Sequence, residues 1–255
     1  MKNNDKNIHD FDFNLICDYF SSTERQGPGS TAATLAALHK IEPISPSSTI
    51  VDLGCGTGAS TLLLAEQCNC KVIGIDLFEQ FLVKLRHKAA AKGIAIDTLV
   101  CSMDNLPFAP TSIDVIWCEG AIYNIGIERG LSLWHHLLKD GGYVVFSDAT
   151  WLTNSLPREV ANFWEEAYPA MGNLEQNLAL IKSLGYEVID HFTLDSKCWT
   201  DNFYKPQHKA QVEFLARHPN NPTAQELVAN QRREADIYNK YGSLYGYVFY
   251  IVRKQ

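Results

Sequence analysis

The stretch Thr49-Ile50-Val51-Asp52-Leu53-Gly54-Cys55-Gly56-Thr57-Gly58 decides the fold of this chain. Its apolar start predicts a buried β-strand that ends at the first glycine, and the following run, 59–66, has helical character. Glycines at such a junction allow positive φ angles and let a ligand approach the main chain closely. The free N–H groups of the helix's first turn then face that ligand. The stretch therefore predicts the start of a nucleotide-binding βαβ unit.

The nucleotide that this unit binds is indicated by Asp52. The glycines also fit the dinucleotide pattern G-x-G-x-x-G/A, with Ala59 in the third place, so an NAD-dependent oxidoreductase is one alternative. However, Asp52 lies at the end of the strand, where a carboxylate would repel phosphate groups through a poorly screening medium. It suits a ligand with positive charge and no phosphate, such as S-adenosylmethionine.

A second carboxylate, Asp76, ends the next predicted strand, 71–76. It follows Gly54 by about twenty residues, the spacing at which an acid reaches a ribose in a βαβ unit. An ionised carboxylate can accept hydrogen bonds from both ribose hydroxyls. We therefore predict that Asp76 binds the ribose and that Leu77 packs on the adenine. The alternative is that Asp76 caps the predicted helix 79–91.

The motif around Gly54 resembles motif I of the class I methyltransferases, V-L-D-x-G-C-G-x-G. The segments 25–30 (Arg-Gln-Gly-Pro-Gly-Ser) and 119–126 (Glu-Gly-Ala-Ile-Tyr-Asn-Ile-Gly) resemble bacterial methyltransferases of the menaquinone/ubiquinone C-methyltransferase-like superfamily. The resemblance covers nearly the whole chain. It implies methyl transfer from S-adenosylmethionine to a small-molecule acceptor, with S-adenosylhomocysteine as product. A protein of this fold that binds the cofactor without catalysis is a second alternative.

The segment after the third predicted strand, 95–101, departs from the family pattern. Such methyltransferases often read G-D-A-x-x-L-P-F there, with the acid on the adenine amino group. Here Ser102, Met103 and Asp104 precede the matching Leu-Pro-Phe of 106–108. The adenine contact is therefore open between the Ser102 hydroxyl, the Met103 N–H and the Asp104 carboxylate. The residues expected to bind the cofactor are Asp52, Gly54, Gly56, Thr57, Gly58, Asp76, Leu77, Ser102, Met103, Asp104 and Glu119.

The resemblance implies an α/β fold with a Rossmann-like, seven-stranded, mostly parallel sheet whose strand 7 is antiparallel. Later strands are expected at 113–118, 143–148, 186–194 and 245–253. We expect one domain, 1–255, divided into an N-terminal helical lid (1–45), a cofactor-binding core (46–194), a helical insertion between strands 6 and 7 (195–243) and the last strand (244–255). An alternative for 1–45 is an ordinary packing helix and connector.

Ligands of open α/β sheets bind at the carboxyl ends of the strands, and three residues that can accept or relay a proton fall there. These catalytic candidates are Glu119, Tyr123 and Asp148. A dedicated base is optional, because alignment of nucleophile and methyl group supplies much of the rate. The residues expected to bind the acceptor are Tyr123, Asn124, Trp151, Trp199 and Tyr204. Alternatively, the aromatic ones only pack the insertion against the sheet.

Composition excludes several other classes. The net charge of −7 gives no basic footprint for nucleic acid or an anionic membrane. The start, Met1–Asn14, lacks the apolar core of an export signal, and no segment is apolar enough to span a bilayer, so a cytoplasmic protein is expected. The seven cysteines lie mostly in apolar segments, as reduced thiols do, and no metal site is expected at Cys68-x-Cys70. The oligomeric state is open, a homodimer included.

Overall fold

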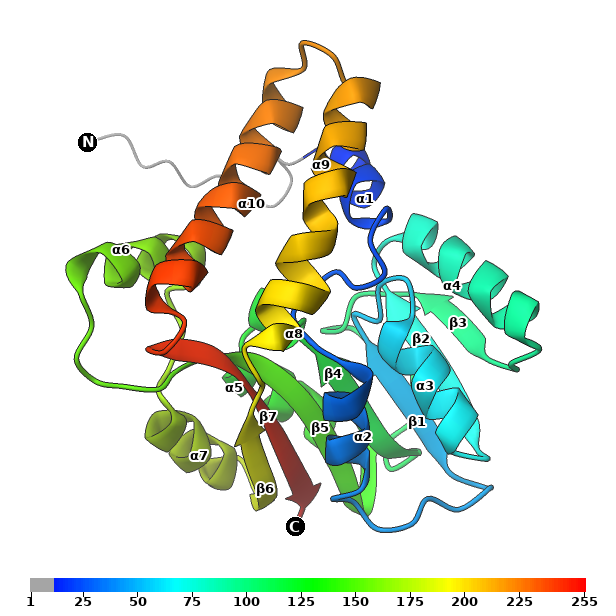
Figure 1. The fold of residues 1–255 in the computed structure, drawn as a ribbon. Coiled ribbons are helices and arrows are strands. Elements are labelled where there is room, and N and C mark those ends of the chain that lie inside the picture. Colours follow the sequence, from blue (N-terminus) through cyan, green and yellow to red (C-terminus); the bar gives the residue numbers. More distant parts are fainter. Residues whose placement is uncertain (1–11) are drawn as a thin grey trace.

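The computed structural model describes residues 12–255. Its centre is a seven-stranded sheet of order β3-β2-β1-β4-β5-β7-β6 (Figure 1). The strands are β1 (Thr49–Leu53), β2 (Lys71–Asp76), β3 (Asp97–Val100), β4 (Ile113–Glu119), β5 (Leu138–Trp151), β6 (Tyr186–Thr193) and β7 (Tyr245–Lys254). Strands β1 to β5 pair in parallel, and β7 lies antiparallel between β5 and β6. The predicted Rossmann-like fold with an antiparallel last strand is confirmed.

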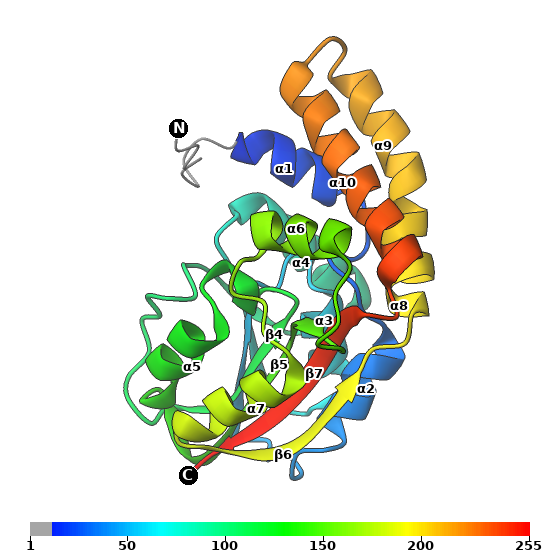
Figure 2. The ribbon, with the colours of Figure 1, turned by 90° about the vertical axis from the view of Figure 1, so that its left-hand side faces the viewer.

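Helices cover both faces of the sheet: α2, α3 and α4 lie on one face, and α5 and α7 on the other (Figures 1 and 2). Because both faces are covered, the central strands are apolar nearly throughout. The helical elements are α1 (Phe13–Phe20), α2 (Thr31–Leu38), α3 (Ala59–Gln67), α4 (Glu79–Lys92), η2 (Ile122–Asn124), α5 (Ile127–His135), α6 (Arg158–Ala167), α7 (Leu174–Ser183), α8 (Lys197–Trp199), η3 (Thr200–Tyr204), α9 (Lys205–Arg217) and α10 (Pro222–Tyr241).

The predicted insertion between strands 6 and 7 consists of α8, η3, α9 and α10, and α1 packs against it. Helices α9 and α10 form a hairpin that rises beyond the carboxyl ends of the parallel strands, with α1 at its side (Figure 2). The Tyr19 hydroxyl of α1 donates to Gln207 Oε1 of α9 at 2.6 Å, and its ring meets Phe214 edge-on. We call α1 together with α8–α10 the cap. The first eleven residues of the predicted lid, 1–45, lie outside the described residues.

One predicted boundary is wrong. The Asp-Gly-Gly sequence at 140–142 reads as the stop of a helix over 131–139, whereas α5 ends at His135 and Leu138 already belongs to β5. A Cβ on Gly142 would lie 3.0 Å from the Asp114 carbonyl oxygen. The glycine therefore lets β5 come close to β4 at an irregular point in a long strand.

Candidate cofactor and acceptor site

The glycine turn after β1 adopts the left-handed backbone that its sequence predicts. Gly54, Gly56 and Gly58 have φ angles of 64°, 54° and 88°. A Cβ on Gly54 would lie 2.4 Å from the Cβ of Ala121 in the turn after β4. The glycine at this position therefore allows the ends of β1 and β4 to close on each other, which forms the edge where a cofactor is expected.

Asp76 joins the glycine turn to the start of α4. Its Oδ2 accepts the Gly56 N–H at 2.8 Å, and its Oδ1 accepts the Phe78 N–H at 2.9 Å. Phe78, not Asp76, occupies the N-cap position of α4. Asp76 therefore supports the start of that helix only through its bond to the Phe78 N–H. Leu77, beside it, is 51% exposed, unusual for a leucine and suited to covering an adenine. Each carboxylate oxygen can accept a further bond, so ribose binding by Asp76 stays a prediction.

We expect Asp76→Asn to weaken S-adenosylhomocysteine binding by about 1.5–3 kcal/mol, the value of hydrogen bonds to a charged group. The amide would still fill the space but would lose the charge and turn one acceptor into a donor. Titration calorimetry measures the affinity, with Asp97→Asn on β3 as the matched control, since that carboxylate pairs with Lys71 at the surface. A fall in thermal stability with unchanged affinity would limit Asp76 to a structural role.

Asp52 is buried beneath the glycine turn, and its binding to the cofactor stays a prediction. The side chain is 1% exposed, and its Oδ2 accepts hydroxyl protons from Ser60 at 2.7 Å and Thr61 at 2.6 Å. Burial raises its pKa to about 7, because the charged form loses its hydration there. Asp52 therefore ties β1 to α3 beneath the glycine turn, while its Oδ1 is buried without a hydrogen-bond partner.

The three adenine candidates are linked to one another and to α5. Ser102 Oγ donates to Asp104 Oδ1 at 2.6 Å, and Arg129 donates to Asp104 Oδ2 at 2.8 Å. The Met103 carbonyl accepts from Trp134 Nε1, and the Met103 side chain lies against Gly54. Each oxygen of Asp104 can still accept a further bond, so the adenine contact stays open among the three.

Glu119 is held in a network that argues against its role as a base. Its Oε1 accepts from Thr34 Oγ1 at 2.6 Å and from Trp117 Nε1 at 2.9 Å, while its Oε2 pairs with Arg25 at 3.3 Å. The carboxylate is largely buried, and these three donors stabilise its charged form. Glu119 therefore anchors the N-terminal segment to the end of β4, and its roles in cofactor binding and catalysis stay predictions.

Gln26, which sequence reasoning missed, brings the N-terminal segment onto the glycine turn. Its Oε1 accepts the Thr57 N–H at 3.0 Å, and its Nε2 donates to the Phe20 and Thr23 carbonyls. A Cβ on Gly56 would lie 2.3 Å from this Oε1. Thr57 is thus covered by this segment, so its binding to the cofactor would require Gln26 to move.

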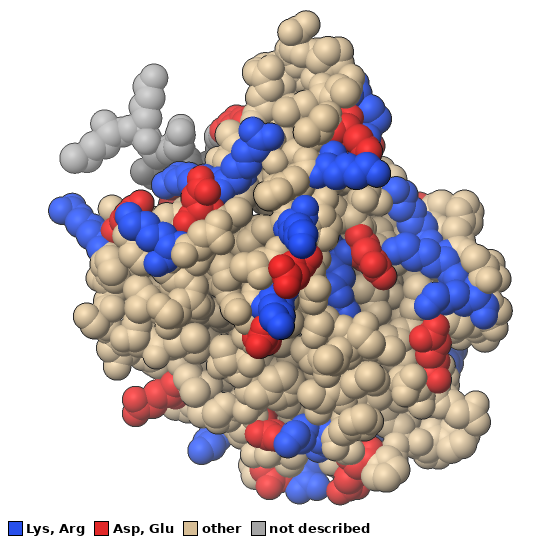
Figure 3. Space-filling model, viewed as in Figure 1, with Lys and Arg blue, Asp and Glu red and all other residues tan. Residues whose placement is uncertain are grey.

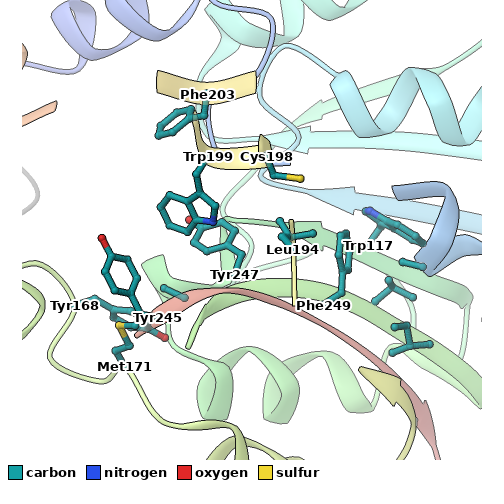
Figure 4. Close-up of a cluster of buried hydrophobic side chains, with 14 of the residues drawn as sticks. Trp117, Tyr168, Met171, Leu194, Cys198, Trp199, Phe203, Tyr245, Tyr247 and Phe249 are labelled. Carbon is teal, nitrogen blue, oxygen red and sulfur yellow. The ribbon is translucent and has the colours of Figure 1, made fainter. Parts of the chain in front are cut away.

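The acceptor candidates gather below the cap. Asp148 of β5 is 1% exposed and accepts the Tyr168 hydroxyl at 2.8 Å, and the Tyr168 ring lies 6.0 Å from that of Tyr123. Trp199 is also buried, and it stacks on Tyr238 with ring centroids 4.5 Å apart. Figure 4 shows Trp199, Tyr247, Tyr245, Tyr168 and Phe203 in one aromatic cluster. Asp148, Tyr123 and the cap are therefore brought together.

The remaining acceptor candidates have structural partners. The Asn124 side chain donates to the Ala121 carbonyl within the turn of η2, and Trp151 packs edge-on against Tyr245. Tyr204 is 5% exposed and donates to Glu234 of α10 at 3.0 Å. Trp199 and Tyr204 are thus buried in the packing of the insertion, as the alternative for them expected. Their rings could form a wall of an acceptor pocket only from within this packing. Glu234 was missed because its sequence context, Arg-Arg-Glu-Ala-Asp, is that of a surface helix.

Comparisons with known proteins agree with this geometry. Residues 50–142 match the family model described as a methyltransferase domain. The chain is 26% identical over 222 residues to a trans-aconitate 2-methyltransferase of Escherichia coli O1:K1 / APEC, covering 83% of this chain and 81% of that protein. It is 37% identical over 111 residues to a demethylmenaquinone methyltransferase of Symbiobacterium thermophilum, covering 41% of this chain and 44% of that protein.

A solved structure shares the fold almost in full. The S-adenosylmethionine-dependent methyltransferase of Geobacter sulfurreducens, in complex with S-adenosylhomocysteine, superimposes with a TM-score of 0.80 at 20% identity, covering 95% of this chain and 98% of that one. The fold is thus that of Rossmann-like methyltransferases. Together, the domain match over residues 50–142 and these relatives support a class I S-adenosylmethionine-dependent methyltransferase. These findings support methyl transfer rather than nicotinamide-dependent oxidation or cofactor binding without catalysis.

Three structural observations bear on the remaining predictions. All seven cysteines are free thiols. Within residues 12–255, no group of three or more His, Cys, Asp or Glu side chains is arranged to hold a metal ion. In the same range, no helix combines the length and apolar character that crossing a membrane requires.

Proposed function

We propose that this methyltransferase acts on a small-molecule acceptor bound between the ends of β4 and β5 and the cap. The observation that carries this proposal is Tyr123, whose side chain is 44% exposed although it follows β4 directly and lies against Tyr168. Large aromatic side chains exposed beside a buried carboxylate are typical of a small-ligand pocket. The two curated relatives described above are also named for small acceptors.

The cap is positioned to enclose such an acceptor. Asn202 of η3 donates to the Gly29 carbonyl at 2.8 Å, and the Gly29 N–H donates to the Cys198 carbonyl at 3.4 Å. The N-terminal segment, which also contacts the glycine turn through Gln26, is therefore bonded to the insertion. An enclosed acceptor would exclude water and would be held in line with the reactive methyl group.

We assign the cofactor to the edge formed by Gly54, Gly56, Asp76, Leu77 and the Ser102–Met103 segment. When bound, S-adenosylmethionine supplies an electrophilic methyl group on a sulfonium. The work of the protein is then largely alignment, which can supply roughly 7–11 kcal/mol of the barrier reduction. Asp148, whose pKa burial raises to about 7, is the best-placed proton acceptor, since a carboxylate with such a pKa is matched to neutral pH.

Charge supports a small molecule over a nucleic acid or an anionic membrane. The net charge is −7. On the face drawn in Figure 3, basic side chains gather over α4, and many of the other basic side chains lie beside acidic side chains. The basic residues of α4 are Lys84, Arg86, Lys88 and Lys92.

Methyl-labelled S-adenosylmethionine tests the proposal directly. We expect label in the small-molecule fraction of a cell extract and none in added protein, RNA or DNA. Tyr123→Ala should lower this transfer about tenfold, the value of one aromatic contact, with S-adenosylhomocysteine affinity unchanged. Val212→Ala, at a 66% exposed position on α9, is the control. Label in a macromolecule, or equal rates for wild type and Tyr123→Ala, would contradict the proposal.

A further inference from the structure

Two acidic side chains near the proposed acceptor site have no cationic partner. Asp148 accepts the Tyr168 hydroxyl on Oδ2, and its Oδ1 is buried without a hydrogen-bond partner. Glu234 of α10 accepts the Tyr204 hydroxyl at 3.0 Å. Among residues 12–255, neither carboxylate forms an ion pair, and the neighbouring Arg233 pairs instead with Glu166. Buried acids without compensation are costly, and such groups mark sites where a ligand completes the charge balance.

Aromatic rings lie beside each of these two carboxylates. On the Asp148 side, Tyr168 packs on Tyr123. On the Glu234 side, Tyr204 lies 6.1 Å from Trp199, and Trp199 meets the Tyr247 ring edge-on at 4.8 Å. The Tyr247 ring covers Gly120 at the end of β4, where a Cβ would lie 2.8 Å from it (Figure 4).

The rings and carboxylates lie in one region below the cap, and one of the rings, Tyr123, is accessible to solvent. Tyr123 is 44% exposed, yet burial raises its pKa, and the charges of Glu234 and Asp148 raise that pKa further. Both carboxylates therefore act on the same phenol. Tyr245 Oη and Trp199 Nε1, in the same cluster, are buried without a hydrogen-bond partner. We call this group of residues, Asp148, Glu234, Tyr123, Tyr168, Tyr204 and Tyr247, the acidic chamber.

We propose that the acidic chamber binds a small organic amine in its cationic form, and that this amine is the methyl acceptor. The inference rests on the proposed function, since it assumes an acceptor below the cap. A cation offsets the charge of Asp148 and Glu234, and aromatic faces attract cations through their quadrupoles. A carboxylate acceptor, such as the trans-aconitate for which one relative is named, would meet two acids and no free cation at this chamber. The acidic chamber therefore argues for a different acceptor in this chain from the one for which that relative is named.

The chemistry places Asp148 as the base. The ammonium gives one proton to Asp148 Oδ1, the oxygen without a partner, and regains a nitrogen lone pair. That lone pair forms the new N–C bond with the methyl group supplied by the cofactor. The broken S–C bond leaves its electron pair on sulfur, so that neutral S-adenosylhomocysteine and a methylated ammonium result. The proton on Asp148 then passes to solvent.

Choline and its neutral carbon isostere, 3,3-dimethyl-1-butanol, test the cation site without catalysis. In protein saturated with S-adenosylhomocysteine, we expect calorimetry to show choline binding at least tenfold more tightly than the alcohol. Asp148→Asn and Glu234→Gln should each remove most of that preference while leaving S-adenosylhomocysteine affinity unchanged. Glu213→Gln, which removes a surface carboxylate of α9 that pairs with Lys209, should leave the preference intact. Circular dichroism shows whether each variant is folded. The comparison of choline with the alcohol in the wild-type protein tests the cation site without any variant.

Labelled methyl transfer separates the failure of this inference from that of the proposed function. Label on amine nitrogen, lost in Asp148→Asn, supports both. Label on the oxygen or carbon of another small molecule, with choline no tighter than the alcohol, overturns the amine acceptor and leaves the proposed function in place. No label in any small molecule overturns the proposed function, and a choline preference that depends on Asp148 would then support the cation site alone.

Discussion

Gly54→Val is expected to reduce S-adenosylhomocysteine affinity by more than about a hundredfold, equivalent to roughly 3 kcal/mol. The φ angle of 64° at this residue costs a branched side chain about 1–2 kcal/mol in strain. A Cβ there would also lie 2.4 Å from the Ala121 Cβ and 3.2 Å from Met103 Cε. The turn after β4 and the Met103 segment would both have to move away, and these are two sides of the cofactor edge.

Gly93→Val is the matched control for this prediction. Gly93 ends α4 with a φ of 66°, so valine there carries similar backbone strain, but no atom lies within 4 Å of its Cβ position. Calorimetric titration and thermal unfolding should show lower stability in both variants and lost affinity only in Gly54→Val. Equal affinities in the two folded variants would mean that the closure of β1 on β4 does not shape the cofactor site.

The fold could be predicted from sequence because its signals are local. The apolar strands end in glycines or acids, such as Gly54 and Asp76, and each acid falls at a strand's carboxyl end. The helix after Ser30 was predictable from its N-cap, and the structure shows that bond at 3.0 Å. The largest error in the strand bounds, at the start of β5, lies where turn residues such as Gly142 fall within a strand.

The site could be predicted only in part, since its electrostatics depend on distant partners. Glu119 reads as a free acid at a strand end, but Arg25, 94 positions earlier in the chain, neutralises it. In the sequence Asp52 looks like an acid that faces a ligand, but in the structure its Oδ2 accepts hydrogen bonds from two hydroxyls of α3. Glu234 reads as a surface residue of α10 until the cap folds over the sheet. Sequence patterns place carboxylates at an edge and cannot tell which of them remain unpaired.

Three acids with raised pKa values predict an unusual dependence of stability on pH. Burial raises the pKa of Asp52 and Asp148 from 3.8, and that of Glu234 from 4.5, to about 7. Between about pH 4 and pH 7 the folded state therefore binds protons that the unfolded chain has already released. Under linkage, the free energy of unfolding is then highest at the acid end of this window and falls as pH rises through 7. Paired carboxylates, with lowered pKa values, give the opposite trend.

We expect the ligand-free protein to be less stable at about pH 8.5 than at about pH 5.5, by roughly 3–6 kcal/mol for the three groups together. Urea unfolding at both values measures the difference. Asp148→Asn should reduce it by about a third, because one of the three titrating groups is removed, while Asp97→Asn, at the exposed edge strand β3, should leave it unchanged. Histidines and surface acids titrate alike in all three proteins, so the comparison isolates Asp148. A wild-type protein that is more stable at the higher pH, or an unaltered difference in Asp148→Asn, would show that Asp148 is ionised and compensated in the folded protein.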